Sequence, residues 1–277
     1  MVSCQQPQEV ELKPEEVDNQ LVVKSIAEAD TGLVLNPVDS SGVLPSDQYR
    51  YEGMFLISSL RYDLGQEVVR PTAFSLVYFS NRKEPIVYRG RIVGYNGLDL
   101  GMVVLNGNPM FRMFHNITLP WSSGDTIAGY KYGKDLTLSH TPNARYTWVV
   151  APLSTAALTV SIDSPGDVNV TSPRGGSVLS RNQDLILQWK NKGNMSIVIS
   201  MIDPVSKAHK PVLNILPGPD RERAVLSSKV LRLLPPNRVY VFTFSVSNRR
   251  ELVNTAQYSG RILVQAASVY NSYVELR

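Results

Sequence analysis

The sequence predicts an all-β fold of two β-sandwich domains that follow an extended N-terminal tether. From about Gln48 onward, apolar and polar residues alternate in short runs that are rich in β-branched and aromatic side chains. Asn-Gly and other turn sequences separate these runs, and helical periodicity is weak throughout. We therefore expect a tether over residues 1–30, one sandwich over residues 31–162 and a second over residues 163–277.

Composition agrees with folded domains and excludes several kinds of site. The chain has 277 residues, of which 43% are hydrophobic and 19% are charged, enough for a core and too balanced for intrinsic disorder. Its one Cys excludes a disulfide framework and a Cys-based metal cluster within the chain, and its three His leave little for a His-rich metal site. No apolar run reaches the ~18–20 residues of a membrane-spanning helix.

The tether is acidic, with seven acidic residues against two basic ones in residues 1–30. Ser3-Cys4 is followed by polar Gln5-Gln6-Pro7, a pattern that resembles the lipobox of bacterial lipoproteins. The resemblance implies that Cys4 carries lipid and that the following residues are a solvated spacer. The alternative is an ordinary free cysteine in a frayed terminus. The best helix candidate of the whole chain is Val17–Ala29, because its apolar residues recur at helical spacing.

The first sandwich is expected to contain about seven or eight short strands. Runs such as Met54–Ile57 and Phe74–Phe79 have the β-branched and aromatic composition of strands. Asn96-Gly97 and Asn106-Gly107 predict two-residue hairpins, since both central residues of a type I′ turn need positive φ.

The second sandwich begins after the turn sequence Asp163-Ser164-Pro165-Gly166. Leu185, Leu187 and Trp189 alternate along one predicted strand and place the Trp against a core. A later stretch runs from Leu234-Pro235-Pro236 to Tyr240 and continues as an alternating apolar strand.

Leu234, Pro235 and Tyr240, together with Trp189, resemble the tyrosine corner and core of fibronectin type III domains, which are immunoglobulin-like sandwiches. The resemblance implies a seven-stranded sandwich in which Trp189 and Tyr240 are structural and the Tyr240 hydroxyl bonds to backbone near Leu234. Two departures from the family pattern are the missing Gly after Pro and a long tail at Ala266–Arg277.

No pattern in the sequence points to catalysis. A G-x-S-x-G elbow, a metal-spaced His pair and a Gly-rich phosphate loop before a helix are all absent. We therefore expect a protein that is not an enzyme, without catalytic residues, cofactor or metal ligands. Nucleic-acid binding is not expected, because the basic residues of the C-terminal part, apart from Arg249-Arg250, are scattered singly and form no stripe.

Two groups of residues are candidate binding residues. Arg249-Arg250 would occupy the loop between the last two strands of a type III domain, a position that such modules often use for partners. Trp121, Tyr130 and Tyr132 are the alternative, since exposed rings stack on sugar faces. Ordinary cross-strand packing is the competing explanation for the two Tyr residues.

These observations predict a non-enzymatic, lipid-anchored protein of the bacterial cell envelope, either periplasmic or on the cell surface. Its two sandwiches would bind a protein or polysaccharide of the envelope, and it would touch the membrane only through its lipid anchor. The alternatives are a carbohydrate-binding protein and a subunit of an extracellular, self-associating assembly. In such an assembly the N-terminal segment or the C-terminal tail would add a strand to a neighbour.

Overall fold

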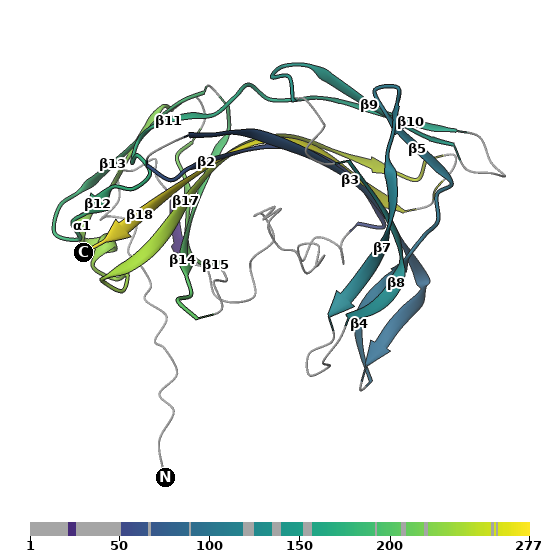
Figure 1. Ribbon diagram of the computed structural model, residues 1–277, viewed down its shortest axis with the longest axis horizontal. Coiled ribbons are helices and arrows are strands. Elements are labelled where there is room, and N and C mark those ends of the chain that lie inside the picture. Colours follow the sequence, from purple (N-terminus) through teal and green to yellow (C-terminus); the bar gives the residue numbers. More distant parts are fainter. Residues whose placement is uncertain are drawn as a thin grey trace, which may run out of the picture.

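The computed structural model (Figure 1) describes residues 22–25, 51–65, 68–88, 90–118, 125–134, 140–151, 157–191, 193–205, 209–218, 221–255, 258 and 260–277. These residues are mostly β-strand, and α1 (Ser228–Leu231) is the one helix among them. The prediction of an all-β fold is therefore confirmed. In the same ranges, none of the helical structure is long and apolar enough to cross a membrane.

One sheet of eleven strands runs through the molecule and bends into an arch (Figure 1). Two neighbouring pairs on the main path, β18–β2 and β4–β8, are parallel, and the other pairs on that path are antiparallel. In spatial order the strands are β1 (Val22–Ser25), β15 (His209–Leu216), β14 (Met195–Ile202), β17 (Arg238–Val253), β18 (Arg261–Leu276), β2 (Gly53–Asp63), β3 (Val68–Tyr88), β4 (Arg91–Gly97), β8 (Asp125–Lys134) and β7 (Phe111–Thr118), with β12 (Val178–Leu179) paired to β18.

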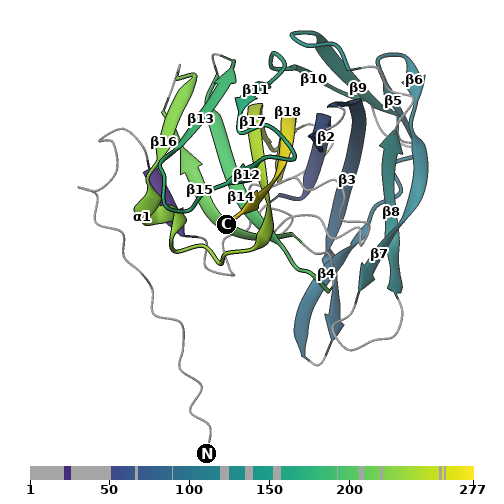
Figure 2. The same cartoon turned by 60° about the vertical axis from the view of Figure 1, so that its left-hand side comes forward.

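Two smaller sheets cover the convex side of the arch, one over each half (Figures 1 and 2). Apolar side chains between each small sheet and the large sheet form two separate cores. The sheet over the N-terminal half is β10 (Leu158–Asp163), β9 (Arg145–Ala151), β5 (Met102–Leu105) and β6 (Asn108–Pro109), and the other is β11 (Asn169–Ser172), β13 (Leu185–Lys190) and β16 (Arg223–Leu226).

The core of the C-terminal half forms around the aromatic residues that the sequence singles out. Trp189 of β13 is buried against alternate side chains of β17, and its ring centroid lies 5.9 Å from that of Phe244. Tyr240 is also buried, and its hydroxyl donates a hydrogen bond to the carbonyl of Pro235 at 2.8 Å. The expected bond from Tyr240 to backbone near Leu234 is therefore present, and Trp189 and Tyr240 are structural residues.

The strand β18 belongs to both cores. Ile262 and Val264 pack in the N-terminal core, whereas Tyr270 and Val274, further along the same strand, pack in the C-terminal core. The segment Ala266–Arg277 was expected to be a tail, but almost all of it lies in this central strand, which pairs with β17 on one side and β2 on the other. That expectation is wrong because the second neighbour, β2, comes from the far end of the sequence.

Asp63, at the end of β2, ties the two halves together. Its buried carboxylate accepts hydrogen bonds from the Tyr270 hydroxyl at 2.9 Å, the Gly175 N–H at 2.9 Å and the Gly65 N–H at 3.0 Å. A Cβ atom on Gly175 would lie 2.1 Å from the Asp63 carbonyl oxygen, so the approach of the two backbones requires glycine. The turn around Gly175 is thus a contact between the halves of the molecule.

The two predicted Asn-Gly turns have different outcomes. Asn106 and Gly107 have φ of 47° and 79° and connect β5 to β6, so this prediction is confirmed. Gly97 instead ends β4 and pairs with Gly129 of β8. The hairpin predicted at Asn96-Gly97 is wrong, because this glycine serves a close crossing of two strands: a Cβ here would lie 2.1 Å from the Tyr130 carbonyl oxygen.

The helix predicted over Val17–Ala29 is also wrong within the part of it that the structure describes. Val22–Ser25 forms β1, which pairs antiparallel with β15, Val22 opposite Leu216. The edge of β15 supplies backbone partners that helical periodicity cannot reveal, and the β-branched pair Val22-Val23 suits a strand. The remaining residues of the predicted helix lie outside the described ranges.

Candidate interaction site on the β7 edge

The arm made by β4, β7 and β8 ends the large sheet, and β7 is its edge strand. Opposite the step from Phe114 to Asn116, β8 carries one extra residue, so the bulge is in β8. Gly129 in this bulge has φ of 82°, and a Cβ atom there would lie 2.2 Å from the Gly97 carbonyl oxygen. Gly97 and Gly129 therefore allow the backbones of β4 and β8 to come close where the two strands cross, and this crossing fixes the position of the arm.

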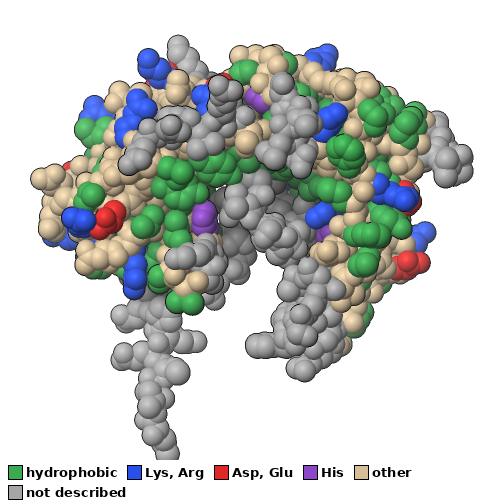
Figure 3. All heavy atoms as spheres, in the orientation of Figure 1, with side chains coloured by type: hydrophobic (Ala, Val, Ile, Leu, Met, Phe, Trp, Pro, Cys, Tyr) green, Lys and Arg blue, Asp and Glu red, His purple; other side chains and the backbone are tan. Residues whose placement is uncertain are grey.

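Large apolar side chains on this edge are exposed. Phe111 is 65% exposed, Phe114 58%, and Ile127 of the neighbouring β8 60%, and Met113 is exposed as well. In Figure 3 hydrophobic side chains gather on the right-hand arm of the arch. Large exposed apolar side chains that are grouped in this way, on the two faces of one edge strand, mark an interaction surface more often than scattered ones do. We call Phe111, Arg112, Met113, Phe114, Ile127 and the underlying Tyr130 the β7 patch.

One face of the β7 patch is a ladder of stacked and hydrogen-bonded groups. The Phe114 and Tyr130 rings stack with centroids 5.7 Å apart and an interplanar angle of 28°. The Arg112 guanidinium carbon lies 4.8 Å from the Tyr130 centroid, and Arg112 Nη1 lies 2.7 Å from Asp99 Oδ2. The Tyr132 hydroxyl donates to Asp99 Oδ1 at 2.5 Å.

Asp99 keeps this ladder in place because it is held as a carboxylate. The hydrogen bond from Tyr132, then that from the Gly101 N–H, lowers the pKa of Asp99 below its usual value. Burial, together with the bond to Asp99, raises the pKa of Tyr132 to about 12. The buried Tyr132 thus fixes Asp99, and Asp99 holds the Arg112 guanidinium over the Tyr130 ring.

The opposite face of β7 contains His115. Its side chain is buried, and its ring centroid lies 4.8 Å from that of Tyr78. Burial, with a smaller contribution from the charge of Lys131, lowers the pKa of His115 to about 4. At neutral pH His115 is therefore uncharged, and its Nδ1 has no hydrogen-bond partner among the described residues.

The three predicted sugar-stacking residues do not form one platform. Tyr130 lies in the β7 patch and is partly accessible. Tyr132 is buried in the N-terminal core, with its hydroxyl also accepting from the Leu100 N–H, so its ring cannot stack on a ligand. The assignment of Tyr132 to a sugar site is wrong. Tyr130 and Tyr132 lie on the same face of β8, but the sheet of β10, β9, β5 and β6 covers Tyr132. Trp121 and the predicted lipid site, Cys4, lie outside the described residues.

Arg249 lies within β17 opposite Gln265, so it is on a strand and not in the expected loop. Its guanidinium donates to the Tyr51 hydroxyl at 2.7 Å and lies 5.3 Å from the Tyr51 ring centroid. The Arg261 guanidinium lies 5.5 Å from the same ring and is paired with Glu251. Two arginines therefore contact one tyrosine ring, and the Arg249 side chain packs against Tyr51 within the fold.

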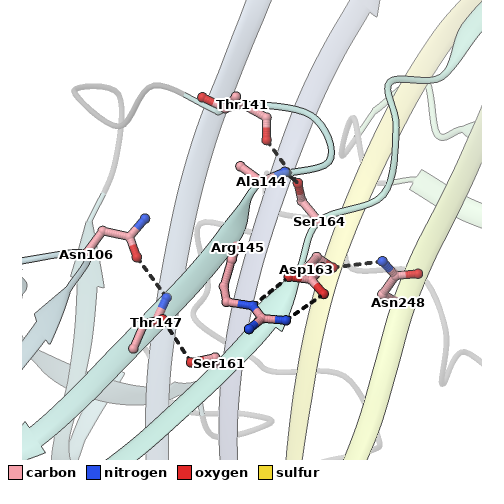
Figure 4. Close-up of polar contacts among 9 residues, drawn as sticks. All are labelled: Asn106, Thr141, Ala144, Arg145, Thr147, Ser161, Asp163, Ser164 and Asn248. Atoms are coloured by element: carbon pink, nitrogen blue, oxygen red, sulfur yellow. Dashed lines mark hydrogen bonds and ion pairs between the residues drawn. The ribbon is translucent and has the colours of Figure 1, made fainter.

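Arg250 also lies in β17, beside the junction of the two halves. Its charge contributes to lowering the pKa of Asp163, although the hydrogen bond from Arg145 contributes more. Figure 4 shows this neighbourhood: Arg145 pairs with Asp163 at 2.9 Å, and the Asn248 side chain donates to the Asp163 carbonyl at 2.8 Å. The prediction that Arg249-Arg250 lies in a loop is wrong. The pairing of β17 with β18 continues past these residues as far as Val253 opposite Arg261.

Within the described ranges, His, Cys, Asp and Glu side chains form no cluster of three or more that could hold a metal ion. Asp99, next to the β7 patch, accepts hydrogen bonds from both Arg112 and Tyr132. These contacts hold the Arg112 side chain in place over the Tyr130 ring.

Sequence reasoning missed Arg112 and Phe114 as candidate residues. The run Phe111-Arg112-Met113-Phe114 places apolar side chains on both faces of the strand, a pattern typical of a strand buried on both faces. Only the position of β7 at the end of the sheet shows that these side chains are exposed.

Comparisons with known proteins give little information on this chain. No protein-family model matches it, and no match is found among curated proteins. Among solved structures, it is similar to the crystal structure of DIP-gamma IG1+IG2, with 11% identity over 81% of this chain and 96% of that chain, at a TM-score of 0.18. At this level the similarity assigns no role to any residue.

Proposed function

We propose that this chain is a non-enzymatic, lipid-anchored protein of the bacterial cell envelope that uses the β7 patch to bind another protein. Two β-sandwich units, the second of fibronectin type III kind, would hold the patch away from the membrane. The observation that carries the proposal is the exposure of Phe111, Phe114 and Ile127 on one edge of the large sheet.

The composition of the β7 patch supports binding to a protein. Aromatic residues, Met and Arg are enriched in protein interfaces, and a few such residues supply most of the binding energy. Arg112 contacts Asp99 and Tyr130, and Phe114 stacks on Tyr130, so the side chains on this face of the patch are held before binding. Less conformational entropy is then lost when a partner binds.

The two remaining parts of the proposal rest on other residues. The hydrogen bond from Tyr240 to Pro235 and the burial of Trp189 support a type III-like second unit. The lipid anchor rests on Ser3-Cys4 alone. In bacteria, the full-length gene product should partition into detergent, and Cys4→Ala should leave it in the aqueous phase. A Cys4→Ala variant that still partitions with membranes contradicts the anchor.

Site-specific photocrosslinking in cells tests the binding surface. A photoreactive phenylalanine analogue at Phe114 should give a discrete crosslinked species of protein nature. The matched control is the same analogue at Val178, which is 53% exposed and lies in β12 of the C-terminal half. Equal crosslinking at both positions, or none at Phe114, contradicts the proposal.

Carbohydrate binding is the second candidate, and the ladder of Phe114, Tyr130, Arg112 and Asp99 favours it. Sugars stack on exposed rings, and neighbouring charged groups orient their hydroxyls. Calorimetric titration with envelope oligosaccharides should then give heat of binding that is lost in both Phe114→Ala and Tyr130→Ala. Protein binding predicts no such heat.

A further inference from the structure

Within the part of the chain that the structure describes, the edge strand β7 lacks most of the features that keep exposed edges from pairing. Its sequence, Phe111–Thr118, contains no Pro, Gly or Lys, and its only formal charge, on Arg112, is paired with Asp99 at 2.7 Å. The bulge next to it lies in β8, so the backbone of β7 stays extended. Natural edge strands are usually protected by charge, Pro, bulges or shortness. Among the described residues, the opposite edge of the same sheet is the four-residue strand β1.

We propose that β7 pairs antiparallel with β7 of a second copy of this chain, with Met113 on the twofold axis. This inference rests on the proposed function, because it names the partner of the β7 patch. A symmetric contact requires a surface that complements itself. A strand that pairs with its own copy places each residue opposite another on the same face of the combined sheet.

The alternation of side chains on β7 makes the strand self-complementary in this register. Arg112 and Phe114 share one face, since both contact the Tyr130 ring. With Met113 on the axis, Arg112 lies opposite Phe114 of the second copy, and Phe114 lies opposite Arg112 of that copy. Two guanidinium–ring contacts form on this face, each between a cation and the negative face of a ring.

The other face of β7 brings no charged side chain of the strand to the pairing in the same register. Met113 meets Met113 of the second copy, and Phe111 lies opposite His115 of that copy. His115 is uncharged at neutral pH, because burial lowers its pKa to about 4. The pairing therefore places no charge opposite Phe111, and methionine adapts its shape to its own copy.

Neighbouring registers complement each other less well. With Arg112 on the axis, two guanidiniums lie opposite each other, and like charges directly across a strand pair are destabilising. With Phe114 on the axis, Arg112 lies opposite Asn116 and both guanidinium–ring contacts are lost. The charge pattern of the strand therefore selects Met113 as the centre.

Disulfide trapping tests both the dimer and its register. In a Cys4→Ser background, Met113→Cys places two thiols directly across the axis, where Cβ atoms of opposed residues are about 4.5–5.5 Å apart, close to the span of a disulfide. Mild oxidation should give a disulfide dimer at least about tenfold faster than for Met102→Cys, an exposed control in β5 that is 57% exposed. Equal rates for the two variants overturn the proposal.

Light scattering on the untrapped Cys4→Ser protein gives a second readout. The mass should rise with concentration towards twice that of the monomer, and Phe114→Ala should weaken the association about tenfold. Phe114 is exposed, so this variant should keep the far-ultraviolet circular dichroism of the folded protein. A protein that stays monomeric at every concentration overturns the dimer. If Phe114 then still crosslinks to a different protein in cells, the proposed function stands and only the identity of the partner is wrong.

Discussion

Asp63→Asn tests whether the two halves of the molecule depend on one buried carboxylate. Asp63 Oδ2 accepts from the Tyr270 hydroxyl and the Gly175 N–H, and Oδ1 accepts from the Gly65 N–H. Asparagine has the same shape but only one acceptor oxygen. When that oxygen serves Tyr270 and Gly175, the amide N–H₂ faces the Gly65 N–H, and one donor is left without an acceptor.

The size of the effect follows from these three bonds. A hydrogen bond to a charged group is worth about 1.5–3 kcal/mol, and one such bond is lost outright. The remaining two become neutral bonds of about half the strength. Together these changes should lower the free energy of unfolding by at least about 3 kcal/mol, the sum of the smallest of these values. For a chain of this length that corresponds to a fall in melting temperature of about 6–12 °C.

Thermal unfolding followed by circular dichroism measures the fall. Because Asp63 of β2 bonds both Tyr270 of β18 and the Gly175 turn, we also expect the transition to broaden as the halves uncouple. Asp163→Asn is the matched control: this carboxylate is also hydrogen-bonded, to Arg145, but both side chains are largely exposed, so little change is expected. A melting temperature for Asp63→Asn no lower than that of the control refutes the reasoning.

Three further predictions concern single residues. Gly129→Ala should lower the free energy of unfolding by at least about 2 kcal/mol, because φ is 82° at this position and a Cβ atom would clash with the Gly97 carbonyl oxygen. Denaturant titration measures the change, and a variant as stable as the wild type would contradict the prediction. Tyr240→Phe removes the bond to the carbonyl of Pro235 and should cost about 1–3 kcal/mol in the same titration, whereas an unchanged midpoint would show that the bond adds nothing. The pKa of His115 is lowered from 6.5 to about 4, so stability should be complete above pH 6.5 and fall as pH drops towards 4. Melting temperatures across this range should fall less for His115→Gln, and an equal fall in both proteins excludes His115 as the cause.

The all-β fold and the aromatic core of the C-terminal half were predictable from the sequence. Alternation with period two is a local property of a strand, and the run from Leu234 to Tyr240 is a local motif whose hydrogen bond spans five residues. The turn at Asn106-Gly107 was predictable for the same reason, since this turn type needs positive φ at both central residues and Asn and Gly adopt positive φ readily.

Predictions failed where the structure at a residue depends on a contact with a segment that is distant in sequence. Gly97 is a glycine because Gly129 crosses it, and Tyr132 is buried because the small sheet covers it. Val22–Ser25 is a strand because β15 has an edge to pair with. In each case the local pattern agrees with two structures, and the choice between them depends on a contact that the pattern does not contain.

The sequence by itself determined the all-β fold and the aromatic core of the C-terminal half, because the alternation of apolar and polar residues along a strand shows which of its faces is buried. The tertiary structure alone decided that β18 joins both halves in one sheet and that β7 ends that sheet. Which strand lies at an edge depends on the order in which strands pair, a property of the whole chain. For this reason the side chains of Phe111 and Phe114, which the sequence would place in a core, are exposed at the end of the sheet.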